Sequence, residues 1–317
     1  MKLIMINDCA FVGETLLKYM PPYIKKQHIK RNHGALGRTF GVTYDILKTR
    51  GDLYHVNYML LECYVALKLG RHPLIAHAHG TDLREELRSK KLGWIVRYNL
   101  KNSDKVFVAQ PTLLHIAKYY NETAEYFPIP FDPELFYPRS LPKEYGKKRI
   151  FLASAHDFRI KGTDKFLRAL ALTQKPFKVI TLKVGKDFRR ALKLSRELCL
   201  EIELINRVPH NRINELYWNS NLVLGSFGIG QLDTVAIEAM ACGRPVVHSI
   251  SKKFYSTCPL EELTSVNEAS ELITRLLTDE KERERRIKTQ LNYVKKIHIA
   301  PILAKRAMKV YKEMMGN

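Results

Sequence analysis

Cysteine is scarce in this sequence and follows no pattern that would bind a metal or build a disulfide framework. The chain has five cysteines among 317 residues, and they are scattered singly, with no Cys-x-x-Cys pair. Zinc sites and disulfide-stapled folds need closely and regularly spaced cysteines. We therefore expect reduced, buried thiols.

Long apolar runs are also absent. No stretch of about 18 or more uninterrupted apolar residues occurs, so we expect no membrane-spanning helix. Residues 1–6 form a strand-like segment that lacks the charged, apolar and small-residue order of a secretory signal. The expectation is a cytoplasmic protein.

Acidic residues are too few to balance the basic ones. Lys and Arg number 53 against 32 Asp and Glu, which leaves a formal net charge of +21 at pH 7. Such a field attracts phosphates on nucleic acid, anionic lipid or nucleotide-sugars. Residues 25–38 interleave basic with apolar residues, and residues 283–312 form a second basic cluster. A solvated surface is the simpler explanation of any one charge run, so charge narrows the partner without naming it.

Short apolar runs alternate with helical patterns along the first 120 residues. This alternation predicts a parallel sheet that is covered by helices on both faces. Expected strands lie at residues 1–6, 51–56, 73–78 and 105–109, and expected helices at residues 14–19, 41–48, 58–69, 83–100 and 113–120.

Five prolines between residues 128 and 142 interrupt this alternation. Prolines stiffen a segment and remove ladder donors, so the stretch has the signature of a linker. The alternation then restarts and continues to residue 248. We expect two Rossmann-like, doubly wound α/β lobes, residues 1–142 and 143–317, facing each other across a ligand-binding cleft. We also expect the last helix to pack back toward the first lobe.

The segment 228–247 carries the most chemical information. Gly228 and Gly230 follow an expected strand, so the backbone there can approach a ligand closely. The helix that follows presents unpaired N–H groups and a dipole that suit a pyrophosphate. Glu238 lies about one turn into this helix, where its carboxylate can reach back to ribose hydroxyls. A Gly-x-Gly fragment alone would be weak evidence, since most such fragments are ordinary turns.

The whole segment resembles the signature of the family 4 retaining glycosyltransferases, which have the GT-B fold. The run EAMACGRPVV at residues 238–247 is similar to the second half of that signature. The resemblance implies transfer of a sugar from a nucleoside-diphosphate sugar with retention of the anomeric configuration. It places the ribose-binding glutamate at Glu238. No metal or other cofactor is expected, because protein cations and amides would carry the charge of the leaving group.

One position departs from the family signature. The first glutamate of the family, which contacts the donor sugar, falls on Gly230. We interpret this as a sign of altered donor preference, and weakened activity is the alternative. The resemblance then leaves the sugar contact to the backbone of Ile229, Gly230, Gln231 and Leu232, and the leaving diphosphate to the amides of Thr234 and Val235.

The family also has an arginine followed five or six residues later by Lys-Gly, and these cations neutralise the donor pyrophosphate. Lys161, with Gly162, matches the second part of this motif. The arginine would fall on Ala155 or His156, neither of which is an arginine. Arg159 is the nearest guanidinium and the expected replacement, with an ordinary surface charge as the alternative, and a protonated His156 is a further candidate.

In the first lobe, His77 and His79 end an expected strand. No third ligand with sensible spacing follows, so a structural role is preferred over a metal site. The resemblance offers His79 as the residue that contacts the donor sugar or the acceptor, with Asp82 orienting it or capping the next helix. Gly13 corresponds in position to a glycine loop of the family that approaches phosphate or acceptor, although a simple turn explains a single glycine as well.

Together these observations predict a glycosyltransferase with His79, Arg159 and Lys161 as catalytic residues. The expected partners are a nucleotide-sugar donor and a glycan or lipid-linked acceptor. Residues 25–38 suggest a further, peripheral contact with the anionic inner face of a membrane. Two alternatives stay open: a non-catalytic basic protein that binds nucleic acid, for which no recognisable motif is present, and a sugar-nucleotide epimerase of the same fold. No specific nucleic acid is expected.

Overall fold

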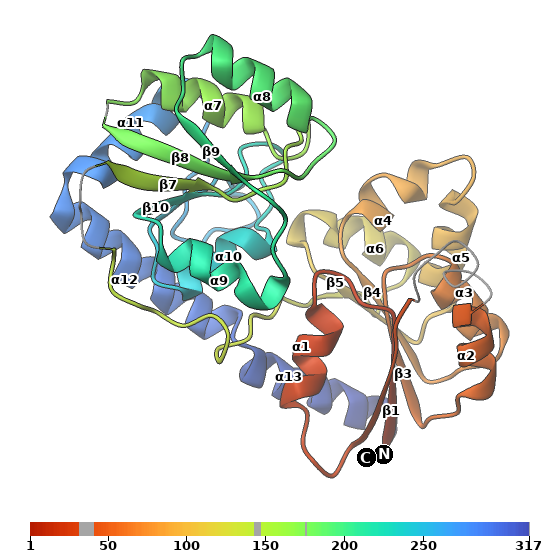
Figure 1. Ribbon diagram of the computed structural model, residues 1–317. Coiled ribbons are helices and arrows are strands. Elements are labelled where there is room, and N and C mark those ends of the chain that lie inside the picture. Colours follow the sequence, from red (N-terminus) through yellow and green to blue (C-terminus); the bar gives the residue numbers. More distant parts are fainter. Residues whose placement is uncertain (32–40, 143–146, 175, 317) are drawn as a thin grey trace. The chain divides into compact units, whose positions relative to one another are not determined.

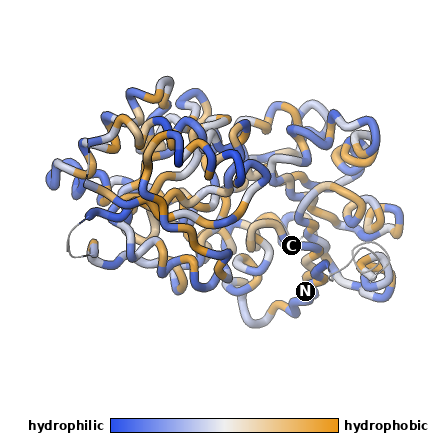
Figure 2. Tube along the Cα trace, turned by 45° about the horizontal axis from the view of Figure 1, so that its top comes forward, coloured by the Kyte–Doolittle hydropathy of each residue, from blue (hydrophilic) through white to orange (hydrophobic). Residues whose placement is uncertain are grey.

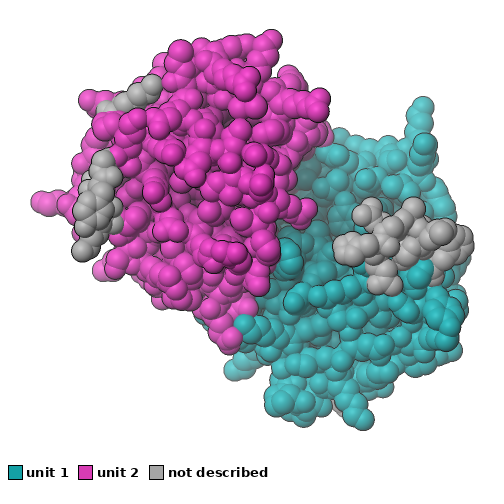
Figure 3. All heavy atoms as spheres, viewed as in Figure 1, with its two compact units in different colours: residues 1–130, 299–317 teal, residues 131–298 magenta. Residues whose placement is uncertain are grey.

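The structure is a computed structural model that describes residues 1–31, 41–142, 147–174 and 176–316. The chain divides into two compact units (Figure 3). Unit 1 contains Met1–Pro130 together with Ile299–Asn317, and unit 2 contains Phe131–His298. Each unit has its own parallel sheet and its own hydrophobic core.

Within the described residues, unit 1 has a parallel sheet with the strand order β2-β1-β3-β4-β5-β6 (Figure 1). The central strands are mostly apolar and are buried on both faces, as expected where helices cover both sides of a parallel sheet (Figure 2). The order of the strands reverses between β1 and β3. The strands are β1 (Lys2–Ile6), β2 (Lys25–Ile29), β3 (Leu53–Asn57), β4 (Leu74–Ala78), β5 (Lys105–Val108) and β6 (Glu125–Tyr126).

Helices pack on both faces of this sheet, and one of them comes from the far end of the chain. Helix α13 (Ala300–Met314) belongs to unit 1 and packs against α1 (Val12–Tyr19) (Figure 1). Its Tyr311 side chain is fully buried and hydrogen-bonds to His55 on β3. The other helices are α2 (Val42–Lys48), α3 (Leu61–Lys68), α4 (Thr81–Arg84), α5 (Gly93–Asn102) and α6 (Leu114–Tyr120).

Unit 2 repeats the doubly wound plan with the strand order β11-β10-β7-β8-β9. All of its strand pairs are parallel, and the order reverses between β7 and β10. The strands are β7 (Lys148–Leu152), β8 (Phe177–Leu182), β9 (Ile202–Ile205), β10 (Leu222–Leu224) and β11 (Val246–Val247). The helices are α7 (Thr163–Leu172), α8 (Phe188–Glu197), α9 (Ile213–Trp218), α10 (Thr234–Ala241), α11 (Val266–Thr278) and α12 (Glu280–Ile297).

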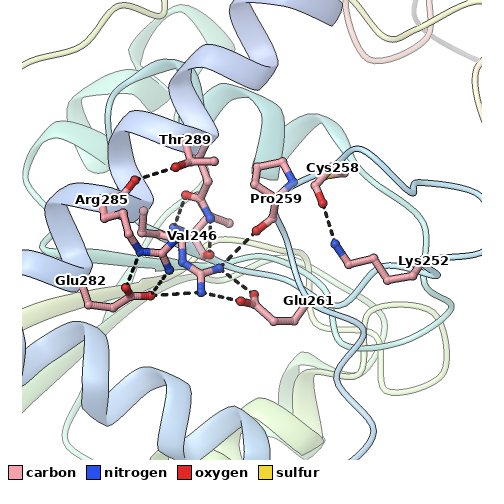
Figure 4. A network of polar contacts seen from close by, with 10 residues as sticks. Val246, Lys252, Cys258, Pro259, Glu261, Glu282, Arg285 and Thr289 are labelled. Atoms are coloured by element: carbon pink, nitrogen blue, oxygen red, sulfur yellow. Dashed lines mark hydrogen bonds and ion pairs between the residues drawn. The ribbon is translucent and has the colours of Figure 1, made fainter.

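Helix α12 holds the edge strand β11 in place through buried polar side chains. The amide of Gln290 bonds to both backbone groups of Val246, at 3.0 and 2.9 Å. Nearby, Arg286 pairs with Glu261 and donates to the carbonyl of Pro259 (Figure 4). A two-residue edge strand has few ladder bonds of its own, so these contacts fix its position.

The structure differs from the sequence-based expectations in strand β2 and in the boundary between the units, among other places. Strand β2 lies at residues 25–29, in the basic stretch, and most of its side chains are exposed, so it lacks the apolar pattern that marks a strand. The division into units falls at 130/131, before the expected boundary at 142/143. The proline-rich segment packs on unit 2, because Asn214 and Trp218 donate to the carbonyls of Leu135 and Tyr137.

Candidate functional site

The strand reversal in unit 2 brings two loops together at the carboxyl ends of β7 and β10. Such reversal points are where ligands bind in open α/β sheets. The loop after β7 reaches Lys161, and its carbonyl accepts from the amide of Phe227 in the loop after β10, at 2.7 Å. Gly228 lies in this contact, and a Cβ there would overlap the carbonyl of Ile160. The glycines of the predicted motif thus let the two loops pack together.

Lys161 is held at this junction by a carboxylate. Its ammonium donates to Asp233 Oδ2 at 2.7 Å, and Ser226 Oγ donates to the same oxygen at 2.5 Å. The other oxygen of Asp233 caps helix α10 by accepting from the amide of Ala236 at 3.1 Å. Ser154, at the end of β7, lies 3.2 Å from Ser226. The predicted cation and the predicted helix N-terminus therefore meet at one point.

The ionisation of Asp233 follows from these contacts. Burial alone would raise the pKa of this carboxyl, but the Lys161 ammonium and the Ser226 hydroxyl hold the pKa well below its usual range. Asp233 is therefore an anion at neutral pH. His248 accepts from the amide of Ser226 through Nδ1, at 2.8 Å, so its proton is on Nε2, which donates to the carbonyl of Gln231 at 2.9 Å.

Glu238 lies on α10 with only 4% of its surface exposed. His210 Nε2 contacts one of its carboxylate oxygens at 2.6 Å, and the Tyr217 hydroxyl donates to the other at 3.1 Å. Burial raises the pKa of Glu238, although the contacts with His210 and Tyr217 oppose the shift. The carboxylate is thus oriented by two partners from the segment between β9 and β10.

The predicted sugar-facing segment has one unusual backbone position. Gly230 has φ of 66°, in the left-handed region, and its carbonyl accepts from Ser251 at 2.9 Å. An L side chain is strained at such a position, which gives a physical reason for glycine where the family has glutamate. Ile229 is partly exposed, whereas Leu232 is buried.

Arg159 and His156 lie in the loop after β7 but in different surroundings. Arg159 is exposed, and its amide bonds to Asp157 at 3.0 Å. His156 is buried, with Nε2 3.2 Å from the Thr181 hydroxyl and its ring 5.6 Å from that of Phe188. Burial lowers the pKa of His156, so this placement does not favour a protonated ring beside a diphosphate.

In unit 1, His79 follows β4 at the carboxyl edge of the sheet. Its Nε2 lies 3.0 Å from Asn57 Oδ1, and since an amide oxygen only accepts, the proton is on Nε2. Burial lowers the pKa of His79 to about 3, so the ring is neutral at physiological pH. The carboxylate of Asp82 accepts from the amides of His79 and Gly80, at 3.1 and 2.8 Å, and shapes the turn into α4.

Gly13 was predicted to lie in a loop, but it lies in the first turn of α1. Its amide donates to Asp8 at 3.0 Å, and a Cβ would lie 2.8 Å from the side-chain nitrogen of Asn57. Glycine is needed here because the helix approaches β3 closely. His77 is buried, and its ring stacks on that of His79 with 4.3 Å between the centroids.

Sequence reasoning missed several residues that shape these sites. The local pattern offered one signal, since Asp233 stands immediately before a helix, where aspartate commonly caps. The partners of Glu238 and His79 gave none, because His210, Tyr217 and Asn57 are more than 20 positions away in the sequence.

Two further features of the described residues bear on metals and membranes. No group of three or more His, Cys, Asp or Glu side chains there is arranged to hold a metal ion. Across the same residues, every helix is too short or too polar to cross a bilayer.

Comparison with known proteins links unit 2 to one family. Residues 139–292 match the family model described as glycosyl transferases group 1. N-acetyl-alpha-D-glucosaminyl L-malate synthase of Bacillus anthracis is 25% identical over 217 residues, which cover 62% of this chain and 56% of that protein. The matched region thus spans little more than half the length of this curated relative.

Solved structures match both units together. Sucrose-phosphate synthase from Thermosynechococcus elongatus gives a TM-score of 0.80 at 17% identity and covers 100% of both chains. Anabaena HepE in complex with UDP-glucose gives 0.79 at 16% identity, covering 99% of this chain and 100% of that one. These likenesses, with the two parallel sheets, confirm the predicted fold of two Rossmann-like lobes, GT-B.

Proposed function

We propose that this chain transfers a sugar from a nucleoside-diphosphate sugar to an acceptor with retention of configuration. The chain belongs to the group 1 glycosyltransferases through residues 139–292. The bond from the anomeric carbon to the diphosphate breaks, and a bond to an acceptor oxygen forms. The observation that carries the proposal is the meeting of Lys161, the N-terminus of α10 and Glu238 at the strand reversal of unit 2.

The leaving diphosphate is the group that this site suits best. Helix α10 presents the amides of Thr234 and Val235 in its first turn, where an α-helix has no internal acceptors for them. Lys161 supplies a cation beside these amides, and Arg159 is a second cation of the same loop. Fixed charges of this kind stabilise the negative charge that develops on the departing nucleotide. We expect the reaction to need no metal, so a chelator should leave its rate unchanged.

Glu238 is proposed to hold the ribose of the donor. Its carboxylate is buried and oriented by His210 and Tyr217, so it is available in one geometry. The backbone of residues 229–232 is proposed to face the sugar. Because Gly230 brings no side chain to this segment, the donor sugar is expected to differ from that of relatives with glutamate here. In unit 1, His79 is the residue proposed to contact the sugar or the acceptor.

The identity of the donor is best approached by a thermal-shift screen of the whole chain. UDP, GDP and their sugars would be compared, starting with UDP-glucose and UDP-N-acetylglucosamine. The first is bound in the HepE structure, and the second combines the same nucleotide with the N-acetylglucosaminyl group in the name of the Bacillus anthracis relative. Product analysis then separates transfer from epimerisation, since only transfer yields a glycoside and free nucleoside diphosphate.

Lys161→Ala and Glu238→Ala should each abolish most of the transfer while the fold is retained. Wild-type rates in both variants would refute the proposal. Tight, salt-sensitive DNA binding with no turnover of any nucleotide-sugar would instead favour the nucleic-acid alternative.

The acceptor is proposed to be a glycan or a lipid-linked sugar, with the chain in peripheral contact with an anionic membrane. The predicted contact lies in residues 25–38, of which 32–38 fall outside the described residues. In the described part, Lys26 donates to the carbonyl of Leu17 at 3.0 Å and Lys30 pairs with Glu14 at 2.6 Å. Some of the charge of this stretch is therefore used within unit 1. Vesicle sedimentation tests the contact, and no binding to anionic vesicles at low salt would count against it.

A further inference from the structure

An open groove in unit 1 lies between the end of α1, the segment that follows it and helix α13. Its volume is about 760 Å³, and apolar side chains form much of its lining. Two of them are exposed to an unusual degree for large hydrophobic residues: Tyr23 has 66% and Ile302 has 53% of its surface accessible. Figure 1 shows α1 and α13 side by side, with the turn that leads from α1 to β2 below them.

One face of α13 adds a row of positive charge to this groove. Lys305, Lys309 and Lys312 are exposed and follow Ile302 at intervals that keep all four on one side of the helix. The lining contains no acidic residue. Lys309 has a weak partner on this helix, with Glu313 at 3.9 Å. Arg306 also lines the groove but donates to the carbonyl of Tyr126 at 2.6 Å.

The combination of exposed apolar groups and a lysine row selects one kind of partner. A soluble phosphate would be satisfied by the lysines and would give no reason to expose Tyr23 and Ile302. The surface of an anionic bilayer satisfies both, because aromatic and aliphatic side chains enter the headgroup boundary while lysines contact lipid phosphates. We propose that this groove docks unit 1 on an anionic phospholipid membrane.

This proposal rests on the membrane contact proposed above but not on the transfer reaction, and the vesicle experiment needs no donor. The whole chain is sedimented with vesicles of phosphatidylcholine that contain roughly one-third phosphatidylglycerol, and separately with phosphatidylcholine alone. Each lysine near the surface contributes roughly a fivefold change in binding at low salt. The triple variant K305E/K309E/K312E should therefore bind the anionic vesicles at least ~100-fold more weakly than the wild type.

The matched control is K281E/K288E/K295E on α12 of unit 2, whose three lysines are also exposed on a long helix. Both variants change the formal charge equally, so total charge cannot separate them. We expect the α12 variant to keep at least half of the wild-type binding. Equal losses in the two variants, or unchanged binding in the α13 variant, would overturn the proposal. Circular dichroism of both variants checks that the helices are intact.

The apolar half of the groove has its own test. Tyr23→Ser with Ile302→Ser keeps every lysine, so some low-salt binding should persist while the binding that resists high salt is lost. If the double variant behaves like the wild type at every salt concentration, insertion is refuted. Preferential binding of RNA over anionic vesicles by the same lysines would also overturn the membrane assignment. Transfer to a soluble acceptor without vesicles should be unchanged in the α13 variant, which separates failure of docking from failure of the enzyme.

Discussion

The ammonium of Lys161 lies 2.7 Å from Asp233 Oδ2, so the cation expected to meet the donor diphosphate already has an anion beside it. Asp233 also caps α10, and so its carboxylate lies at the helix end where a phosphate would bind. A diphosphate at this position must either share Lys161 and the helix end with the Asp233 carboxylate or displace that carboxylate. Asp233 is therefore expected to tune how tightly the donor binds.

Replacing Asp233 by Asn should strengthen the binding of nucleoside diphosphates. Asparagine can still cap α10 through its side-chain oxygen, but the charge that opposes the diphosphate is gone. We expect UDP or GDP, whichever binds the wild type, to bind about tenfold more tightly by calorimetry, a change of about 1.4 kcal/mol. Glu197→Gln, an exposed acid on α8, is the control and should have no effect. Weaker binding in D233N would show that Asp233 serves mainly to position Lys161.

The same variant should lose stability in a pH-dependent way. The folded-state pKa of Asp233 is depressed, so its ionised form stabilises the fold at every pH above the unfolded pKa near ~4. That contribution disappears as the pH falls from ~4 through the folded value. We expect D233N to be less stable than the wild type at pH 7, by roughly 1–3 kcal/mol in urea unfolding. The difference in unfolding free energy between the wild type and D233N should become smaller below about pH 4. A difference that does not depend on pH would exclude the ion pair as its cause.

Much of the fold could be predicted because its signals are local. Central parallel strands such as β3 and β4 are buried along their whole length and mostly apolar, and the helices between the strands have their own periodicity. Strand β2 gave no such signal, since it is an exposed edge strand of polar residues. The unit boundary was also hidden, because prolines mark a stiff segment but do not tell which core it packs against.

In the candidate site, too, local motifs could be predicted from the sequence, whereas contacts between distant segments could not. Lys161, Gly228 and Glu238 could be proposed from the sequence because each belongs to a short motif. Their partners lie in other segments of unit 2, and only the sheet order brings Ser154 to Ser226, 72 positions apart. Motif spacing predicts where a residue lies along the chain but not where its side chain points. The backbone of His156 is in the predicted loop, but its side chain packs inward against Thr181.

Glu238→Gln should separate function from stability. Burial raises the pKa of Glu238, so ionising this side chain lowers the stability of the fold as the pH rises from the unfolded pKa near ~4 through the folded value. We expect the glutamine variant to unfold at the same temperature as the wild type or higher at pH 7, and transfer to fall at least ~100-fold. Glu215→Gln, on neighbouring α9 and exposed, is the matched control. A stable variant with full activity would remove Glu238 from the donor site.

Gly228→Ala should damage the donor site through the backbone. A methyl group at this position would overlap the carbonyl of Ile160, and the loop that carries Lys161 would have to move. We expect a loss of about 1–3 kcal/mol in stability and weaker binding of nucleoside diphosphates. Gly70→Ala is a control in open space that costs only about 1 kcal/mol for its positive φ. If G228A binds nucleotide as well as G70A does, the close packing of the two loops is not needed for the site.

Asn57→Leu should alter catalysis through His79 without touching the donor. Asn57 Oδ1 fixes the proton of His79 on Nε2, and the amide nitrogen of Asn57 lies 3.0 Å from the sulfur of Met5 and 3.4 Å from the carbonyl of Asn7. Without this contact the ring can rotate and exchange tautomers, so the nitrogen that faces substrate is no longer defined. We expect kcat to fall about tenfold with little change in KM, and His79→Ala to fall ~100-fold or more. A substitution that only disturbed the packing of this buried site would lower the stability of the fold. The thermal midpoint of each variant is therefore measured alongside kcat. If kcat is retained in N57L while H79A is inactive, His79 acts without orientation by Asn57.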